Sequence, residues 1–90
     1  MITAKEAASG KLAIEHQLRE IDYHISVAAQ DMCYQICYTI DVKFLKFIPQ
    51  IVKKLQKSGY EVILRERYNV APIAIKDIKF DRPIVLHVSW

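Results

Sequence analysis

Glycine and proline are scarce in this chain, with 2 and 3 copies among 90 residues. That scarcity argues against a disordered or low-complexity protein, because those classes are usually rich in one or both. The chain also lacks an apolar stretch near the ~20 residues that a membrane-spanning helix needs. Its first residues do not join a basic segment to an apolar run, so we expect no secretory signal peptide. We therefore predict one soluble domain over residues 1–90, with no membrane contact.

Cysteine is also rare, and Cys33 and Cys37 are the only two. On a β-strand their spacing corresponds to roughly 13 Å, which is too far for a disulfide within the chain. No further cysteine or histidine stands at a spacing typical of zinc ligands. We expect two small, buried thiols in a reducing compartment.

Motifs that carry catalysis are missing as well. The sequence has no glycine-rich phosphate loop, no suitably spaced pair of carboxylates, and no nucleophile beside a base. The three histidines, His16, His24 and His87, have no spacing typical of metal ligands. The sequence thus predicts a protein that is not an enzyme, with no catalytic residue, cofactor or metal.

Charge is modest, whereas apolar content is high. A net charge of +3 from 13 basic and 10 acidic residues is far from the dense basic patch of nucleic-acid-binding proteins, which argues against such a partner. Hydrophobic residues make up 52% of the chain, which is much for so short a domain. The usual place for surplus apolar surface is a subunit interface.

The N-terminal third of the sequence predicts a long helix. Thr3 and Glu6 form a capping-box pattern, and Ile2 before them is placed to act as a hydrophobic staple. Glycine at position 10 weakens the helix locally. From residue 14 onward, apolar residues recur at steps of four and three, which indicates a heptad seam. The seam consists of Ile14, Leu18, Ile21, Ile25, Ala28 and Met32.

A helix over residues 4–31 is about 40 Å long, whereas an eight-residue strand spans only about 26 Å. The overhang is expected to meet the same helix of a second copy, so the seam residues are the predicted interface of a homo-oligomer. In the alternative, the helix breaks at Gly10 or near Tyr23 and packs onto its own domain.

The rest of the chain alternates strand and helix patterns. Strands are predicted at 33–40, 60–68 and 84–90 from their period of two. A helix is predicted to begin near Ile48, because Pro49 suits a first helical position, and to end at a left-handed Gly59.

The sequence leaves the structure of two segments undecided. Residues 41–47 either extend a strand or form a helical turn, and residues 69–83 either pair as a strand or pack as a flap. The predicted fold class is α+β: a long N-terminal helix over 1–32, then a β-α-β-β unit over 33–90 with a small antiparallel or mixed sheet.

The last strand carries the only tryptophan. Trp90 is in phase with Ile84, Leu86 and Val88, so we expect its large side chain to plug the core. In the alternative, Trp90 lines a subunit contact.

The opposite strand face is predicted to carry Arg65, Arg67, His87 and Ser89, with Gln35, Thr39, Cys33 and Cys37 on the neighbouring strand. The candidate ligand-binding residues are Arg65, Arg67 and His87 of this face, together with Tyr68. Arginine suits phosphate and carboxylate groups, because its planar guanidinium donates several hydrogen bonds at once. The alternative is a half-exposed sheet whose two arginines pair with Glu61 and Glu66 or with solvent.

Three short motifs follow one another along the chain: TAKEA at 3–7 opens the long helix, SGYEV occupies 58–62, and VSW occupies 88–90. In this order they resemble a group of small proteins of tailed bacteriophages, which begin with a TAxEA-like helix and end in an ISW or VSW strand. The resemblance spans most of the chain. It departs at residues 69–83, which are longer and more apolar than expected, and at the apolar 44–52, where the group tends to be charged.

The resemblance implies a non-enzymatic, homo-oligomeric phage protein that acts by protein–protein contacts, as a virion-associated or assembly component. Its partners would be copies of itself and other virion proteins, in the host cytoplasm or the virion. The alternative is an oligomeric sponge that sequesters a nucleotide signal of host anti-phage defence, with the four candidate ligand-binding residues in pockets between subunits.

Overall fold

The computed structural model describes residues 1, 3–5 and 9–90. Its fold is α+β, as predicted, with a long helix near the N-terminus and a small antiparallel sheet that packs against it and a second helix. In chain order the elements are α2 (Lys11–Gln30), β1 (Gln35–Ile40), the 3₁₀ helix η1 (Val42–Phe47), α3 (Ile48–Lys57), β2 (Glu61–Glu66), β3 (Pro72–Ile73), the 3₁₀ helix η2 (Ile75–Asp77) and β4 (Ile84–Ser89).

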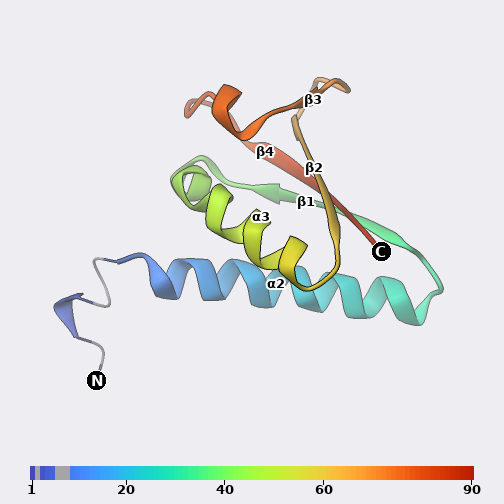
Figure 1. The fold of residues 1–90 in the computed structure, drawn as a ribbon, viewed down its shortest axis with the longest axis horizontal. Helices are drawn as coiled ribbons and strands as arrows, with labels where there is room; N and C mark the ends of the chain where they lie inside the picture. The colour runs from blue at the N-terminus through green and yellow to red at the C-terminus, as the bar shows by residue number, and fades with distance from the viewer. Residues whose placement is uncertain (2, 6–8) are drawn as a thin grey trace.

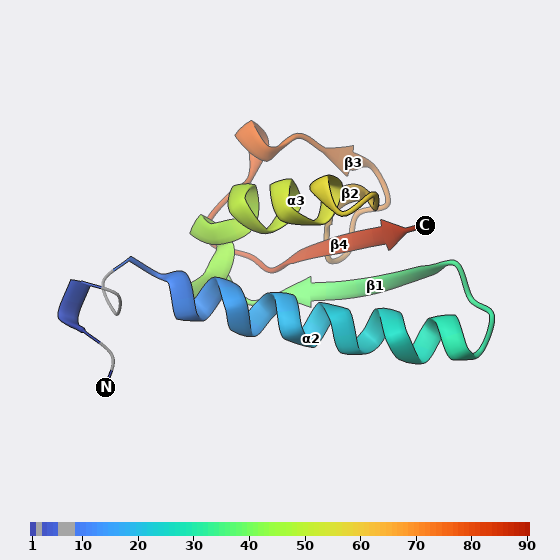
Figure 2. The same cartoon turned by 60° about the horizontal axis from the view of Figure 1, so that its bottom comes forward.

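The described strands form one sheet in the order β1-β4-β2-β3, and every neighbouring pair is antiparallel. The strand nearest the C-terminus, β4, therefore lies inside the sheet, paired with β1 on one side and β2 on the other. In both views α2 runs below β1 along the length of the strand (Figure 1, Figure 2).

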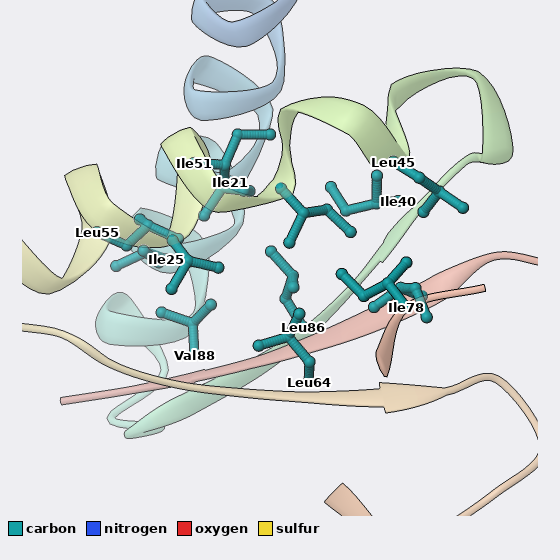
Figure 3. Close-up of a cluster of buried hydrophobic side chains, with 13 residues drawn as sticks. Ile21, Ile25, Ile40, Leu45, Ile51, Leu55, Leu64, Ile78, Leu86 and Val88 are labelled. Carbon is teal, nitrogen blue, oxygen red and sulfur yellow. The ribbon is translucent and has the colours of Figure 1, made fainter. Parts of the chain in front are cut away.

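One apolar core joins the two helices to a single face of the sheet (Figure 3). Ile21 and Ile25 come from α2, Ile51 and Leu55 from α3, and Leu86 from β4. Alternate positions of each strand reach this core, in the phase that the sequence predicts. Burying a side chain of this size stabilises the fold by about 1.5–3 kcal/mol.

The N-terminal helix is shorter than predicted. Ala4 and Lys5 are helical, but a turn at Ser9 and Gly10 separates them from α2. Gly10 has a φ of 75°, which disfavours other residues, and a Cβ there would overlap the ring of Phe47. The 20 residues of α2 span about 30 Å. The predicted capping box and staple involve residues 2 and 6, which lie outside the described residues.

The predicted seam packs against the chain's own core. Ile21 and Ile25 are 0% and 7% exposed, and Ile14 and Leu18 pack partly against the same cluster. Met32, in contrast, is 76% exposed beyond the end of the helix. The structure thus agrees with the alternative of a break at Gly10 and packing onto the chain's own domain. Self-association stays a prediction, and it needs another surface.

The two segments whose structure the sequence leaves undecided are both partly helical. Within residues 41–47, Val42–Phe47 form η1, and the carboxylate of Asp41 before it accepts a 2.6 Å hydrogen bond from the backbone N–H of Val42. Residues 69–83 contain β3 and η2, and Ile78 within them belongs to the core. The second helix begins at Ile48 and ends before Gly59, whose φ is 94°, so both predicted boundaries are confirmed.

Candidate functional site

The candidate site is the sheet face opposite the core, called the open face from here on. No helix of the described chain covers it, because α2 and α3 both contribute to the core on the other side. Strand register arranges its side chains in three parallel rows. The middle row is Cys37–His87–Ile63, and the flanking rows are Thr39–Val85–Arg65 and Gln35–Ser89–Glu61.

A polar chain crosses this face from β1 to β2. The Sγ atom of Cys37 lies 3.4 Å from Nδ1 of His87, and Nε of Arg65 donates a hydrogen bond to Nε2 of the same imidazole. An arginine side chain only donates hydrogen bonds, so Nε2 must be the unprotonated, accepting nitrogen. The proton of the neutral imidazole therefore sits on Nδ1 and faces the sulfur of Cys37.

This tautomer limits the chemistry of the Cys37–His87 pair. A histidine that already carries its proton on Nδ1 cannot take one from the thiol, which is what a catalytic cysteine requires of its base. Nor does Nδ1 then offer a lone pair to a metal ion. Among the described residues, no group of three or more His, Cys, Asp or Glu is placed to hold a metal. The polar chain connects side chains of three strands, β1, β4 and β2.

Arg65 has no acidic partner among the described residues. Its Nη1 donates to the backbone carbonyls of Glu66 and Arg67, at 3.3 and 3.1 Å. The Glu66 carboxylate instead binds Arg82 at 2.8 Å, so the pairing expected for Arg65 with Glu66 is not formed. The positive charge of Arg65 is therefore fixed in place without a negative partner.

Arg82 differs from Arg65 in this respect. Hydrogen bonds from its guanidinium to Glu66 and Asp81 raise the pKa of Arg82, and both carboxylates also act on it through their charge. The ion pair between Arg82 and Glu66 connects the end of β2 with the residues that precede β4.

A shallow hollow of about 430 Å³ opens beside the polar chain. Its walls combine Ile63, Val70 and Pro72 with Arg65 and His87. Ile63 and Val70 are 51% and 93% exposed, so apolar side chains reach solvent next to an unpaired cation. This mixture suits a partner with an apolar surface and a negative charge.

The structure brings together only two of the four predicted ligand-binding residues, Arg65 and His87. Arg67 and Tyr68 lie in the turn after β2, where the guanidinium carbon of Arg67 is 5.5 Å from the centre of the Tyr68 ring. They line a separate hollow of about 240 Å³, together with Glu66, Asn69, Arg82 and Pro83.

Two predictions about individual side chains are wrong. Cys33 and Cys37 are exposed, not buried, since Cys37 points to the uncovered face and Cys33 precedes the strand. Trp90 is on the core side but remains 38% exposed, so it does not plug the core. Trp90 lies past the end of β4, and its ring is edge-on to the ring of Tyr60, with 6.1 Å between the two ring centres. Its backbone N–H donates a hydrogen bond to the carbonyl of Tyr34.

Sequence reasoning places Cys37 and Ile63 on this strand face but does not count them among the candidate ligand-binding residues. Their place in the site follows from the pairing of β4 with β1 and β2, which places Cys37, His87 and Ile63 at one level. The alternation in each strand indicates the correct face, but it carries no signal for which strands are neighbours.

Comparison with protein-family models, with curated proteins and with solved structures finds no match to this chain. Across the described residues, no helix combines the length and the apolar content that crossing a membrane requires.

Proposed function

We propose that this chain is a non-enzymatic protein that acts by protein–protein contacts through its open face, including contacts between copies of itself. The observation that carries this proposal is an uncovered sheet face on which Ile63 and Val70 stay exposed beside a fixed, unpaired Arg65. Exposed apolar groups gathered in one place typically mark an interaction surface. On the resemblance to small phage proteins, the contacts serve virion structure or assembly.

A rigid surface favours recognition over chemistry. Arg65 is held by His87 and by two backbone carbonyls, so its position is set before any partner arrives. A preorganised side chain loses little conformational freedom on binding, which favours association. The Cys37–His87 pair adds rigidity to the face but no base for the thiol.

The test is the molar mass in solution, measured by light scattering over a wide range of protein concentration. We expect a mass above the 10.5 kDa of one chain that rises with concentration. Ile63→Asp should return the chain to a monomer, because it places a charge in the middle row of the open face. A matched control is Tyr23→Asp on the outer side of α2, where Tyr23 is 65% exposed, and it should leave the mass unchanged.

The proposal fails if the wild type is a monomer at every concentration and Ile63→Asp changes no measured interaction. It also fails if Tyr23→Asp, but not Ile63→Asp, abolishes association, since that result places the contact on α2.

A second candidate function is the sequestration of an anionic nucleotide signal, again suggested by the phage resemblance. The observation in its favour is that Arg65 borders the hollow without an acidic partner among the described residues. Nucleotides that raise the melting temperature of the wild type, but not of Arg65→Gln, would support this function over the first.

A further inference from the structure

We infer that the open face binds a second copy of itself, with the two sheets packed face to face and Glu61 of each copy paired with Arg65 of the other. This inference rests on the proposed function and specifies its partner. In the dimer, a two-fold axis runs along the middle row, Cys37–His87–Ile63, so the strands of the two copies are antiparallel across the interface.

The register of the strands carries the geometry. Glu61 and Ser89 are opposite each other on one side of the middle row, and Arg65 and Val85 are opposite each other on the other side. A two-fold axis along the middle row exchanges these two sides. It therefore places Glu61 over Arg65 of the second copy, and Ile63 over Ile63 of the second copy.

Charge complementarity selects this arrangement. Of the nine residues in the three rows, only Glu61 and Arg65 carry a charge, and the charges are opposite. Neither has an ion pair among the described residues, and four positions along one strand separate them by about 13 Å, too far to pair with each other. A two-fold axis along the strand direction would leave both charges facing β1, whose Gln35 and Thr39 are neutral.

The distances suit these side chains. Packed sheets lie about 10 Å apart with strands rotated by about 30°, so groups two residues from the axis shift by only about 3–4 Å. Glutamate and arginine are long enough to bridge that offset. At the centre, Ile63 and His87 meet their own copies, which is what a self-complementary interface requires.

The face is small, and this sets the strength of the dimer. Three strands of six residues cover a footprint of roughly 300 Å², well below the ~800 Å² that each partner buries in a standard interface. Val70 and Pro72 enlarge it at the β3 side. We therefore expect a reversible dimer that forms at micromolar or higher concentration.

The experiment is a charge exchange followed by sedimentation equilibrium of the full chain. Glu61→Arg and Arg65→Glu should each weaken the dimer by roughly tenfold or more, because each one places like charges opposite each other. An equimolar mixture of the two variants should associate again. In the mixed dimer the new arginine of one variant faces the new glutamate of the other, and the unchanged Arg65 faces the unchanged Glu61. The mixture also controls for folding, because a misfolded variant could not regain the partner.

A second measurement is independent of Arg65. Cys37 lies in the row on the axis, so the Cys37 thiols of the two copies should be close together. In a Cys33→Ser variant, a short bismaleimide should therefore link two copies through Cys37. A further Cys37→Ser change should abolish the product. The inference is overturned if the mixture stays as dissociated as each variant alone and the linker gives no dimer. If Ile63→Asp still abolishes association in that case, the proposed function survives with a different geometry.

Discussion

At the scale of single residues, one polar contact inside the fold ties α2 to the sheet. The hydroxyl of Tyr38 donates a 2.9 Å hydrogen bond to Oε1 of Gln17, which is only 5% exposed. We expect Tyr38→Phe to lower the free energy of unfolding at neutral pH by about 1–2 kcal/mol, because it leaves the buried amide oxygen without its donor. Urea unfolding of the variant and the wild type measures the difference.

The same tyrosine gives a pH dependence. Burial, and secondly the charge of Glu20, raise the pKa of Tyr38 above its ordinary value of 10.0 in the folded chain. The folded state therefore holds this proton more tightly than the unfolded state. The contribution of Tyr38 to the stability of the fold is fully present below pH 10 and is lost as the pH rises toward the higher folded pKa. Tyr38→Phe should lose less stability than the wild type above pH 10. The control is Tyr34→Phe at a 65% exposed ring, and an alkaline loss identical in all three proteins would contradict the assignment.

At the scale of elements, both helices end with the same backbone motif but with different residues. In α3 the backbone N–H groups of Gly59 and Tyr60 bind the carbonyls of Gln56 and Leu55. In α2 those of Met32 and Cys33 bind the carbonyls of Ala29 and Ala28 in the same pattern. The residue in the left-handed position is glycine in α3, at a φ of 94°, but methionine in α2, at a φ of 59°.

This difference predicts a stabilising substitution. Met32→Gly should raise the free energy of unfolding by about 1 kcal/mol, because glycine relieves the left-handed strain and the 76% exposed side chain gives up little burial. Thermal unfolding followed by circular dichroism measures the gain. The reciprocal Gly59→Ala, in a position with open space around it, should lower the melting temperature. A melting temperature of Met32→Gly at or below that of the wild type would show that Met32 makes a contact that outweighs the strain.

The helix ends also show how far the sequence predicts elements. Glycine marks the end of α3 because it is the residue that the left-handed position favours. Methionine gives no such signal at position 32. Because Met32 continues the apolar spacing of the seam, the sequence assigns it to the helix, although α2 ends at Gln30. The apolar seam exists as one face of α2, but Ile21 and Ile25 of this face pack against the chain's own sheet. An apolar spacing of three and four residues predicts a buried helix face but does not indicate which surface covers it.

At the scale of the whole molecule, the sequence predicts which face each strand residue occupies but not which strands are neighbours. The pairing of β1 with β4 brings together Cys37 and His87, which are 50 positions apart in the chain. No local pattern encodes that contact, because it depends on how the complete chain closes its sheet. The exposure of Trp90 has a similar origin, since the length of the core beneath β4 follows from where α3 ends and β2 begins.

Residues 67–83 are an insertion between two strands that are already neighbours. Glu66 pairs with Ile84, so β2 and β4 form an antiparallel pair that a two-residue turn would close. β3 pairs with the far side of β2 as a two-residue edge strand, and Ile78 is the buried core residue that the insertion supplies.

Replacing residues 67–83 with Asn-Gly should therefore leave a folded chain. The loss of Ile78 from the core should cost about 2–4 kcal/mol, with the sheet and both helices kept. Circular dichroism and amide hydrogen exchange of β4 check this, and loss of cooperative unfolding would show that the insertion is needed to close the core. A matched comparison is Ile78→Ala in the full chain, which removes most of the core contact and keeps the insertion. The shortened chain also lacks Val70 and Pro72 but retains Glu61, Ile63 and Arg65, so self-association that survives the replacement assigns the contact to the three rows of the open face.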